Sequence, residues 1–155
     1  MVLNSEGMPA HPDRGPSSAA AWPSPAQSEF ALLYEQRLQA VALPIFERAR
    51  QLLNAQGVAA HVLHGTGPDG LVRVALCVEL AGVYQPEPAQ HCYCIKADRQ
   101  LGRVVYEQRV EGESTQFTAE LASLNETVLN TELGRFLISR CDHSIDLLAE
   151  HKIGF

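Results

Sequence analysis

The sequence lacks the features that mark membrane proteins, exported proteins and nucleic-acid-binding proteins. It has no apolar run near the roughly 20 residues that span a bilayer, and its N-terminus has neither the basic start nor the apolar stretch of a signal peptide. Lys and Arg number 12 against 18 Asp and Glu, and the arginines are interleaved with acidic or apolar residues. Because clustered cations hold a phosphate backbone, we expect a cytoplasmic protein that binds neither nucleic acid nor membrane.

Catalytic motifs are absent too: the chain has no serine-elbow, Walker, His-Glu-x-x-His or paired-carboxylate motif. "GTGPDG", residues 65–70, has the glycine spacing of a dinucleotide-binding turn. Such a turn needs a helix to open at its last glycine, whereas Gly70 precedes a strand pattern and Pro68 has no N–H to offer a phosphate. We interpret the segment as a turn and expect no cofactor. The sequence favours a non-enzymatic role, and a site built from scattered residues stays open.

The four cysteines do not stand in a metal-binding arrangement. In "HCYC", Cys92 and Cys94 share one face of a strand, while His91 and Tyr93 point to the other. Two such cysteines start about 6.6 Å apart, whereas the sulfurs around tetrahedral zinc lie under about 4 Å apart. In "CDH", residues 141–143, the thiol and the imidazole lie about 200° apart on a helix. We therefore expect small packed thiols and no metal.

Composition divides the chain into a tail and a domain. Residues 1–27 hold five of the nine prolines, together with serine, alanine and glycine. Because this composition buries too little apolar surface to offset the entropy of ordering, we expect 1–27 to be a flexible tail. Residues 28–155 are then one domain.

A long amphipathic helix opens the domain. Ser24, Pro25 and Gln27 supply an N-cap, a proline in the first turn and a capping-box glutamine. An apolar stripe at steps of three and four follows and ends before Gly57: Phe30, Tyr34, Leu38, Val41, Ile45, Ala49 and Leu52. Pro44 cannot donate a hydrogen bond to the carbonyl of Ala40, so the helix should kink or break there.

After Gly57 the hydrophobic period changes to two. Alternation predicts four antiparallel strands, "GVAAHVLH", "LVRVALCVEL", "HCYCIKA" and "GRVVYEQRV". From Thr118 the chain reads as a second long helix, and a hairpin over residues 134–155 is the alternative. The fold class is therefore a two-layer α+β domain, a four-stranded antiparallel meander with a long helix at each end packed on one face. The core positions of the strands are Val72, Val74, Leu76, Val78, Tyr93, Ile95, Val104, Tyr106 and Val110.

The register of the strands decides which cysteines meet. Symmetric hairpins would set Cys77 opposite Cys94, Glu79 opposite Cys92, and Cys94 opposite Val105. Three thiols then gather on the outer face of the sheet beside acidic residues and a lysine, with no histidine. The loop of about ten residues between the second and third strands leaves this register open.

The outer face of the sheet is the expected functional surface. It mixes charges with small apolar residues, namely Leu71, Ala75, Cys77, Cys92, Cys94 and Val105. Such a face is too apolar to be fully exposed to solvent and too charged to belong to a core. We therefore expect it to bind a protein partner, most simply a second copy in a homodimer. The element order is similar in outline to small adaptor and secretion-chaperone domains. The alternative is a small-molecule or enzymatic pocket between helices and sheet, lined by His91, Tyr93 and Tyr106.

Overall fold

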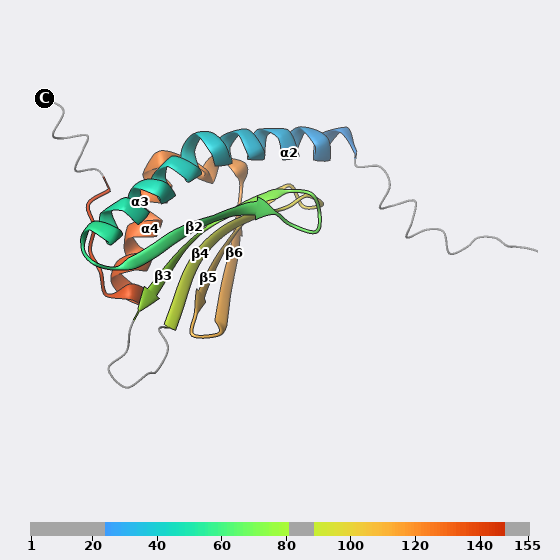
Figure 1. The fold of residues 1–155 in the computed structure, drawn as a ribbon. Helices are drawn as coiled ribbons and strands as arrows, with labels where there is room; N and C mark the ends of the chain where they lie inside the picture. Colours follow the sequence, from blue (N-terminus) through green and yellow to red (C-terminus); the bar gives the residue numbers. More distant parts are fainter. Residues whose placement is uncertain (1–23, 81–88, 148–155) are drawn as a thin grey trace, which may run out of the picture.

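The protein is an α+β domain with two layers, a sheet and the helices that cover one of its faces (Figure 1). This computed structural model describes residues 24–80 and 89–147, so the expected tail lies almost wholly outside the described residues. The helical elements are α2 (Pro25–Arg37), the π-helical turn η2 (Leu38–Ala42), α3 (Leu43–Ala55), the 3-10 turn η3 (Leu121–Ser123) and α4 (Glu126–Cys141). The strands are β2 (Ala59–Thr66), β3 (Val72–Leu80), β4 (Ala89–Asp98), β5 (Arg103–Val110) and β6 (Glu113–Ala119).

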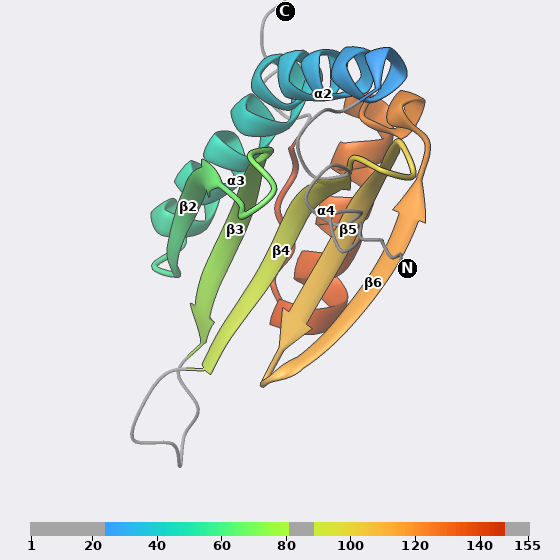
Figure 2. The ribbon, with the colours of Figure 1, turned by 90° about the vertical axis from the view of Figure 1, so that its right-hand side faces the viewer.

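The sheet has five antiparallel strands in chain order, β2-β3-β4-β5-β6. Figure 2 views it from the side that the helices leave open, with α4 behind β4 and β5. α3 contacts β2 and β3, and α4 contacts β4. Helices therefore cover one face of the sheet, and no helix within residues 24–80 and 89–147 covers the other.

The N-terminal helix starts and is interrupted where the sequence predicts. The side chain of Ser24 accepts from the N–H of Gln27, and the Gln27 side chain accepts from the N–H of Ser24. Before Pro44 the chain widens into η2, in which the N–H of Leu43 reaches the carbonyl of Leu38, five residues back. Pro44 lacks an N–H, and the π-turn before it accommodates this missing hydrogen-bond donor without a break in the helix.

The π-turn also shifts the buried stripe. A π-turn holds more residues than an α-turn, so buried positions recur at wider steps across it. Ala42 and Phe46 are fully buried, although the regular stripe passes through Val41 and Ile45 instead. The predicted stripe is therefore correct before the turn and incomplete after it.

The prediction of four strands is wrong by one, because β6 follows β5 through a two-residue turn. Glu111 and Gly112 both have positive φ, 53° and 85°, as a type I′ hairpin turn requires. β6 is exposed along nearly its whole length, so it shows no apolar alternation. Edge strands of this kind carry no hydrophobic signal in the sequence.

The C-terminal helix forms, later than predicted. α4 begins at Glu126, where the side chain of Asn125 caps the N–H of Val128, and not at Thr118. It runs through Gly134 and ends at Asp142, which adopts the left-handed conformation. The hairpin alternative is wrong for residues 134–147, and residues 148–155 lie outside the described residues.

The segment "GTGPDG" is a turn, as expected. Gly65 and Thr66 end β2, and the N–H of Gly70 donates to the carbonyl of Gly67 at 3.0 Å, closing a β-turn around Pro68. Gly70 has φ +82°, which favours glycine. The side chain of Arg73 packs against Gly67, so a side chain at this glycine would displace it.

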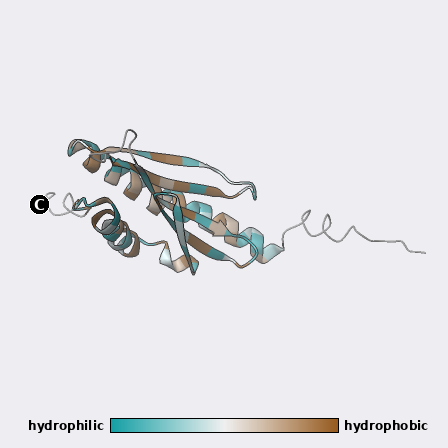
Figure 3. Ribbon diagram, turned by 90° about the horizontal axis from the view of Figure 1, so that it is seen from below, coloured by the Kyte–Doolittle hydropathy of each residue, from teal (hydrophilic) through white to brown (hydrophobic). Residues whose placement is uncertain are grey.

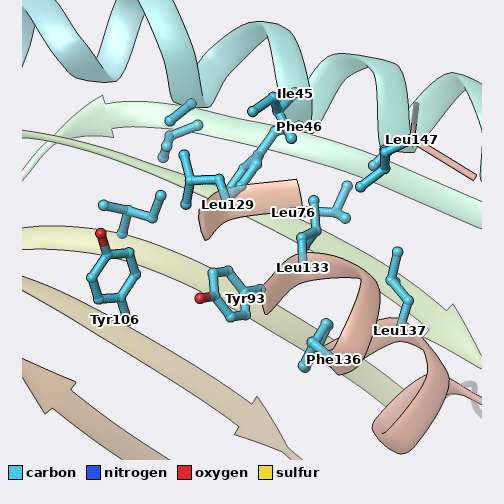
Figure 4. Packing of buried hydrophobic residues seen from close by; sticks show 14 of the residues in the cluster. Ile45, Phe46, Leu76, Tyr93, Tyr106, Leu129, Leu133, Phe136, Leu137 and Leu147 are labelled. Carbon is cyan, nitrogen blue, oxygen red and sulfur yellow. The ribbon is translucent and has the colours of Figure 1, made fainter. Parts of the chain in front are cut away.

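The core lies between the helices and the sheet (Figure 4). Of the predicted strand positions, Val72 and Val110 are partly buried and the others are buried. Figure 3 shows hydrophobic and hydrophilic residues alternating along the strands. Within residues 24–80 and 89–147, no helix has the length and apolarity needed to cross a membrane.

Candidate functional site

The candidate site is the side of the sheet that no described helix covers, which we call the helix-free face. Strand register and the two-residue period define its residues. They include His61, Leu63, Arg73, Ala75, Cys77, Glu79, Gln90, Cys92, Cys94, Lys96, Val105, Glu107, Arg109, Ser114, Gln116 and Thr118. Three of the four cysteines meet here, as the sequence predicts.

The predicted register is wrong in both hairpins. Cys77 lies opposite Cys92, and Cys94 lies opposite Ala75 on one side and Glu107 on the other. Both hairpins differ from the prediction by two residues, a shift that keeps each side chain on its face and changes only its neighbours. Between β4 and β5 the reason is a four-residue loop that follows Asp98, whose carboxylate accepts from the N–H of Leu101.

The thiols are shielded from water although no helix packs over them. Cys77 is 1% exposed and Cys94 is 8% exposed, whereas Cys92 is half-buried. All three line a hollow of about 350 Å³ that also touches Leu63, Arg73, Gln90 and Arg109. The face is therefore a shallow depression with thiols at its centre.

Cys77 and Cys92 are direct neighbours across the strands. The adjacent Cys77 thiol lowers the pKa of Cys92, and the nearby guanidinium of Arg109 lowers it further. The adjacent Cys92 thiol, together with burial, raises the pKa of Cys77. Burial likewise raises the pKa of Cys94. The pair therefore favours one thiolate, on Cys92.

An ionised carboxylate lies beside the thiols. Glu107 is 4% exposed; its carboxylate lies 3.0 Å from Nζ of Lys96 and 3.4 Å from Nε of Arg109, and it accepts from the hydroxyl of Ser114. Burial alone would raise the pKa of Glu107, but hydrogen bonds from Ser114, Lys96, Gln116 and Arg109 outweigh it and lower the pKa to about 2. Arg109 therefore links the carboxylate to the thiol pair.

A histidine also lies on this face, which corrects the expectation of none. His61 is the β2 partner of Cys77. Among the described residues, however, no group of three or more His, Cys, Asp or Glu side chains is placed to hold a metal ion. His61, Cys77, Cys92 and Arg109 thus form one row of direct neighbours across strands β2 to β5.

Leu71 does not belong to this surface. It precedes β3, is 5% exposed and joins the hydrophobic core on the other side of the sheet. It lies just outside the strand, next to the turn in which Asp69 accepts from its N–H, so strand alternation does not apply to it. Ala75, Cys77, Cys92, Cys94 and Val105 lie on the helix-free face as predicted.

The alternative site residues lie between helices and sheet, and side chains fill the space there. His91, Tyr93 and Tyr106 are buried. The ring of Tyr93 packs against Phe46 and Phe136, with centroids 6.1 and 5.4 Å away (Figure 4). These contacts are those of a packed core.

The motifs "HCYC" and "CDH" meet, which sequence reasoning missed. Nδ1 of His91 lies 2.9 Å from the carbonyl oxygen of Arg140 and 4.0 Å from the sulfur of Cys141. Burial raises the pKa of Cys141 to about 12, so this thiol stays protonated. A signal was present: His91 lies on the core face of its strand, and Cys141 follows Leu137 by one turn of the helix.

Comparison with known proteins adds no further argument. No protein-family model matches this chain, and neither a curated protein nor a solved structure matches it.

Proposed function

We propose that this chain is a protein-binding domain whose helix-free face pairs with the same face of a second copy. One observation carries the proposal: at the centre of this face, small side chains are shielded from water although no described helix covers them. Cys77 and Cys94 are almost fully buried, and the neighbouring Ala75 is half-buried. A sheet face that stays in water is normally polar at alternate positions, so this centre is better suited to a partner than to solvent.

Charge arrangement favours self-pairing. On the helix-free face, β3 runs from Arg73 through Ala75 and Cys77 to Glu79. In a face-to-face dimer whose twofold axis crosses β3, the two β3 strands run in opposite directions, which sets Arg73 over Glu79 of the second copy. Nε of Arg73 is buried without a hydrogen-bond partner among the described residues. Short side chains between the two charges allow close approach of the sheets.

The small-molecule or enzymatic alternative has less support. A ligand between helices and sheet would need space near His91, Tyr93 and Tyr106, where Phe46 and Phe136 already pack. The hollow with polar and thiol groups lies on the opposite face.

Size-exclusion chromatography with light scattering tests the proposal. The wild type should be a dimer at micromolar concentration, and Val105→Glu or Cys94→Lys should give monomers with unchanged circular dichroism. Ile138→Glu is the matched control, because Ile138 is 58% exposed on α4, away from this face. A monomeric wild type, or unfolding of both face variants, would contradict the proposal.

A charge swap tests the twofold arrangement itself. Arg73→Glu and Glu79→Arg should each weaken the dimer, because each places like charges opposite one another. The double variant restores the pairing and should recover dimerisation. Equal weakening by the double variant would rule out this orientation.

A further inference from the structure

We propose that Cys92 and Cys77 form a reactive dithiol that reduces small peptide-like disulfides entering the hollow and closes to a cross-strand disulfide. This inference goes beyond the proposed function and does not depend on it, because all the reacting groups of the protein belong to one chain. It stands on the register of β3 and β4 and on the hollow that the thiols line.

The register selects the pair. Residues directly opposite in antiparallel strands have Cα atoms about 4.5–5.5 Å apart, within the roughly 4.4–6.8 Å that a disulfide bridges. Cys77 and Cys92 are directly opposite, whereas Cys94 is diagonal to Cys77, at about 7–8 Å. Cys92 and Cys94 are alternate residues of one strand, so their side chains run parallel. Only Cys77 and Cys92 can close without movement of the backbone.

Exposure assigns the two roles. Cys92 is the most accessible of the three thiols on this face and borders the hollow, so it is the attacking group. Cys77 is 1% exposed, so it is the resolving thiol. The pKa of Cys92, which the adjacent Cys77 and Arg109 lower, supports this order because the thiolate is the nucleophile.

The lining of the hollow indicates the class of substrate. Arg73 and Arg109 are its charged residues, and Gln90 adds an amide. Oxidised glutathione is a small disulfide that carries carboxylates. Its carboxylates can bind the two guanidinium groups while its disulfide lies next to the Cys92 thiolate. The hollow, at about 350 Å³, is at the low end of the range for small-molecule sites, so one half of such a molecule would fill it.

The reaction balances as two exchanges. The Cys92 thiolate attacks one sulfur of R–S–S–R, forming a Cys92–S–S–R bond and releasing R–S⁻, which takes a proton from water. Cys77 then loses its proton to water and attacks the sulfur of Cys92, which releases the second R–S⁻. This thiolate also takes a proton from water, which balances the proton that Cys92 lost on ionising. The protein loses two electrons and two protons, and the small disulfide is reduced to two R–SH.

The first experiment uses the reduced full chain and oxidised glutathione, below the concentration of any self-association. Mass spectrometry should show the loss of two hydrogens and a Cys77–Cys92 cross-link, with two glutathione thiols released per chain. Cys77→Ser should stop at a persistent glutathione adduct on Cys92, Cys92→Ser should form no adduct on this face, and Cys141→Ser should behave as wild type, because Cys141 belongs to the hydrophobic core and does not line the hollow. A cross-link to Cys94, or no adduct in Cys77→Ser, would overturn the proposal.

The main comparison of a second measurement is made within the wild type, so misfolding of a variant does not affect it. Brief alkylation of the folded wild type with iodoacetamide near pH 7 should label Cys92 at least about tenfold faster than Cys94 or Cys141. Arg109→Gln should move the pH midpoint of this labelling upward, and Arg109→Lys should restore it in part. Equal labelling of all thiols would overturn the proposal. If the wild type is a monomer and forms the Cys77–Cys92 disulfide, only the proposed function is contradicted. If it is a dimer and does not form this disulfide, only this inference is contradicted.

Discussion

The two faces of the sheet exclude water in different ways. The helix-covered face does so with large side chains, since Leu76, Tyr93 and Ile95 pack under α3 and α4 and are 0% exposed. The helix-free face does so with short side chains and an ion network, because Cys77 is 1% and Glu107 is 4% exposed with no described helix above them. Burial alone therefore does not distinguish the core from a sheet face that no described helix covers.

The comparison is sharpest between neighbours in β3. Leu76 and Cys77 are adjacent, equally buried and on opposite faces. Leu76→Ala should lower the free energy of unfolding by about 2–5 kcal/mol, because it leaves a cavity that the surrounding core cannot close. Cys77→Ala should cost about 1 kcal/mol or less, since little apolar area is lost at the edge of a hollow. Urea denaturation of the two variants measures the difference; equal costs would mean that the helix-free face is a second core.

Removing the buried charge tests the ion network. Glu107→Gln should destabilise the fold by about 1–3 kcal/mol at pH 7, because Lys96 and Arg109 lose their carboxylate partner. Glu113→Gln is the control, since Glu113 is exposed on β6, and it should change stability by less than about 0.5 kcal/mol. Equal effects of the two variants would show that the network adds no stability.

The same carboxylate gives the stability a pH dependence. The pKa of Glu107 in the folded state is about 2, below the ordinary value of 4.5. Its stabilising contribution is therefore complete above the ordinary pKa and is lost as pH falls through 4.5 toward 2. Urea denaturation from pH 7 to about 2 measures the free energy of unfolding of the wild type and of Glu107→Gln. The difference between the two should become smaller as pH falls through this window. A constant difference would contradict the lowered pKa of Glu107.

Two buried tyrosines on the helix-covered face test what a hydrogen bond contributes to its stability. The hydroxyl of Tyr106 lies 2.6 Å from Oγ of Ser123, whereas the buried hydroxyl of Tyr93 has no hydrogen-bond partner among the described residues. Tyr106→Phe should cost about 1 kcal/mol. Tyr93→Phe should be neutral or slightly stabilising, because it removes an unpaired polar group. Thermal unfolding compares the pair, and a larger loss for Tyr93→Phe would point to a partner in the segments outside the described residues.

The smallest expected effect is that of the tail. Deleting residues 1–23 should leave the melting temperature within a few degrees, because proline-rich, core-poor sequence contributes little burial. A large drop would mean that this segment packs on the domain, and loss of dimerisation with unchanged melting would place it at the contact surface. Calorimetry and light scattering of the same sample separate these outcomes.

Local patterns were sufficient for several elements. The cap at Ser24, the interruption before Pro44 and the alternation from Val72 to Leu80 act over a few residues, so they could be predicted. β6 could not be, because an exposed edge strand needs no apolar alternation. The exact stripe on α3 was also hidden, since it depends on how many residues the π-turn holds.

The candidate site, too, could be predicted only in part. That Cys77, Cys92 and Cys94 share a face follows from the two-residue period, which is a property of any strand. Which of them are neighbours depends on register, and a shift of two residues changes the pair without moving any side chain to the other face.

The sequence by itself determined the α+β class, the helix cap at Ser24, the turn at Gly67–Gly70 and the two faces of each central strand, because these depend on contacts within a few residues. Only the tertiary structure decided the pairing of Cys77 with Cys92, the ion network at Glu107, the meeting of His91 with Cys141, and the transfer of Leu71 to the core. The physical reason is that these contacts depend on the register of neighbouring strands and on how the sheet and helices pack together. The period of a single helix or strand fixes neither of them.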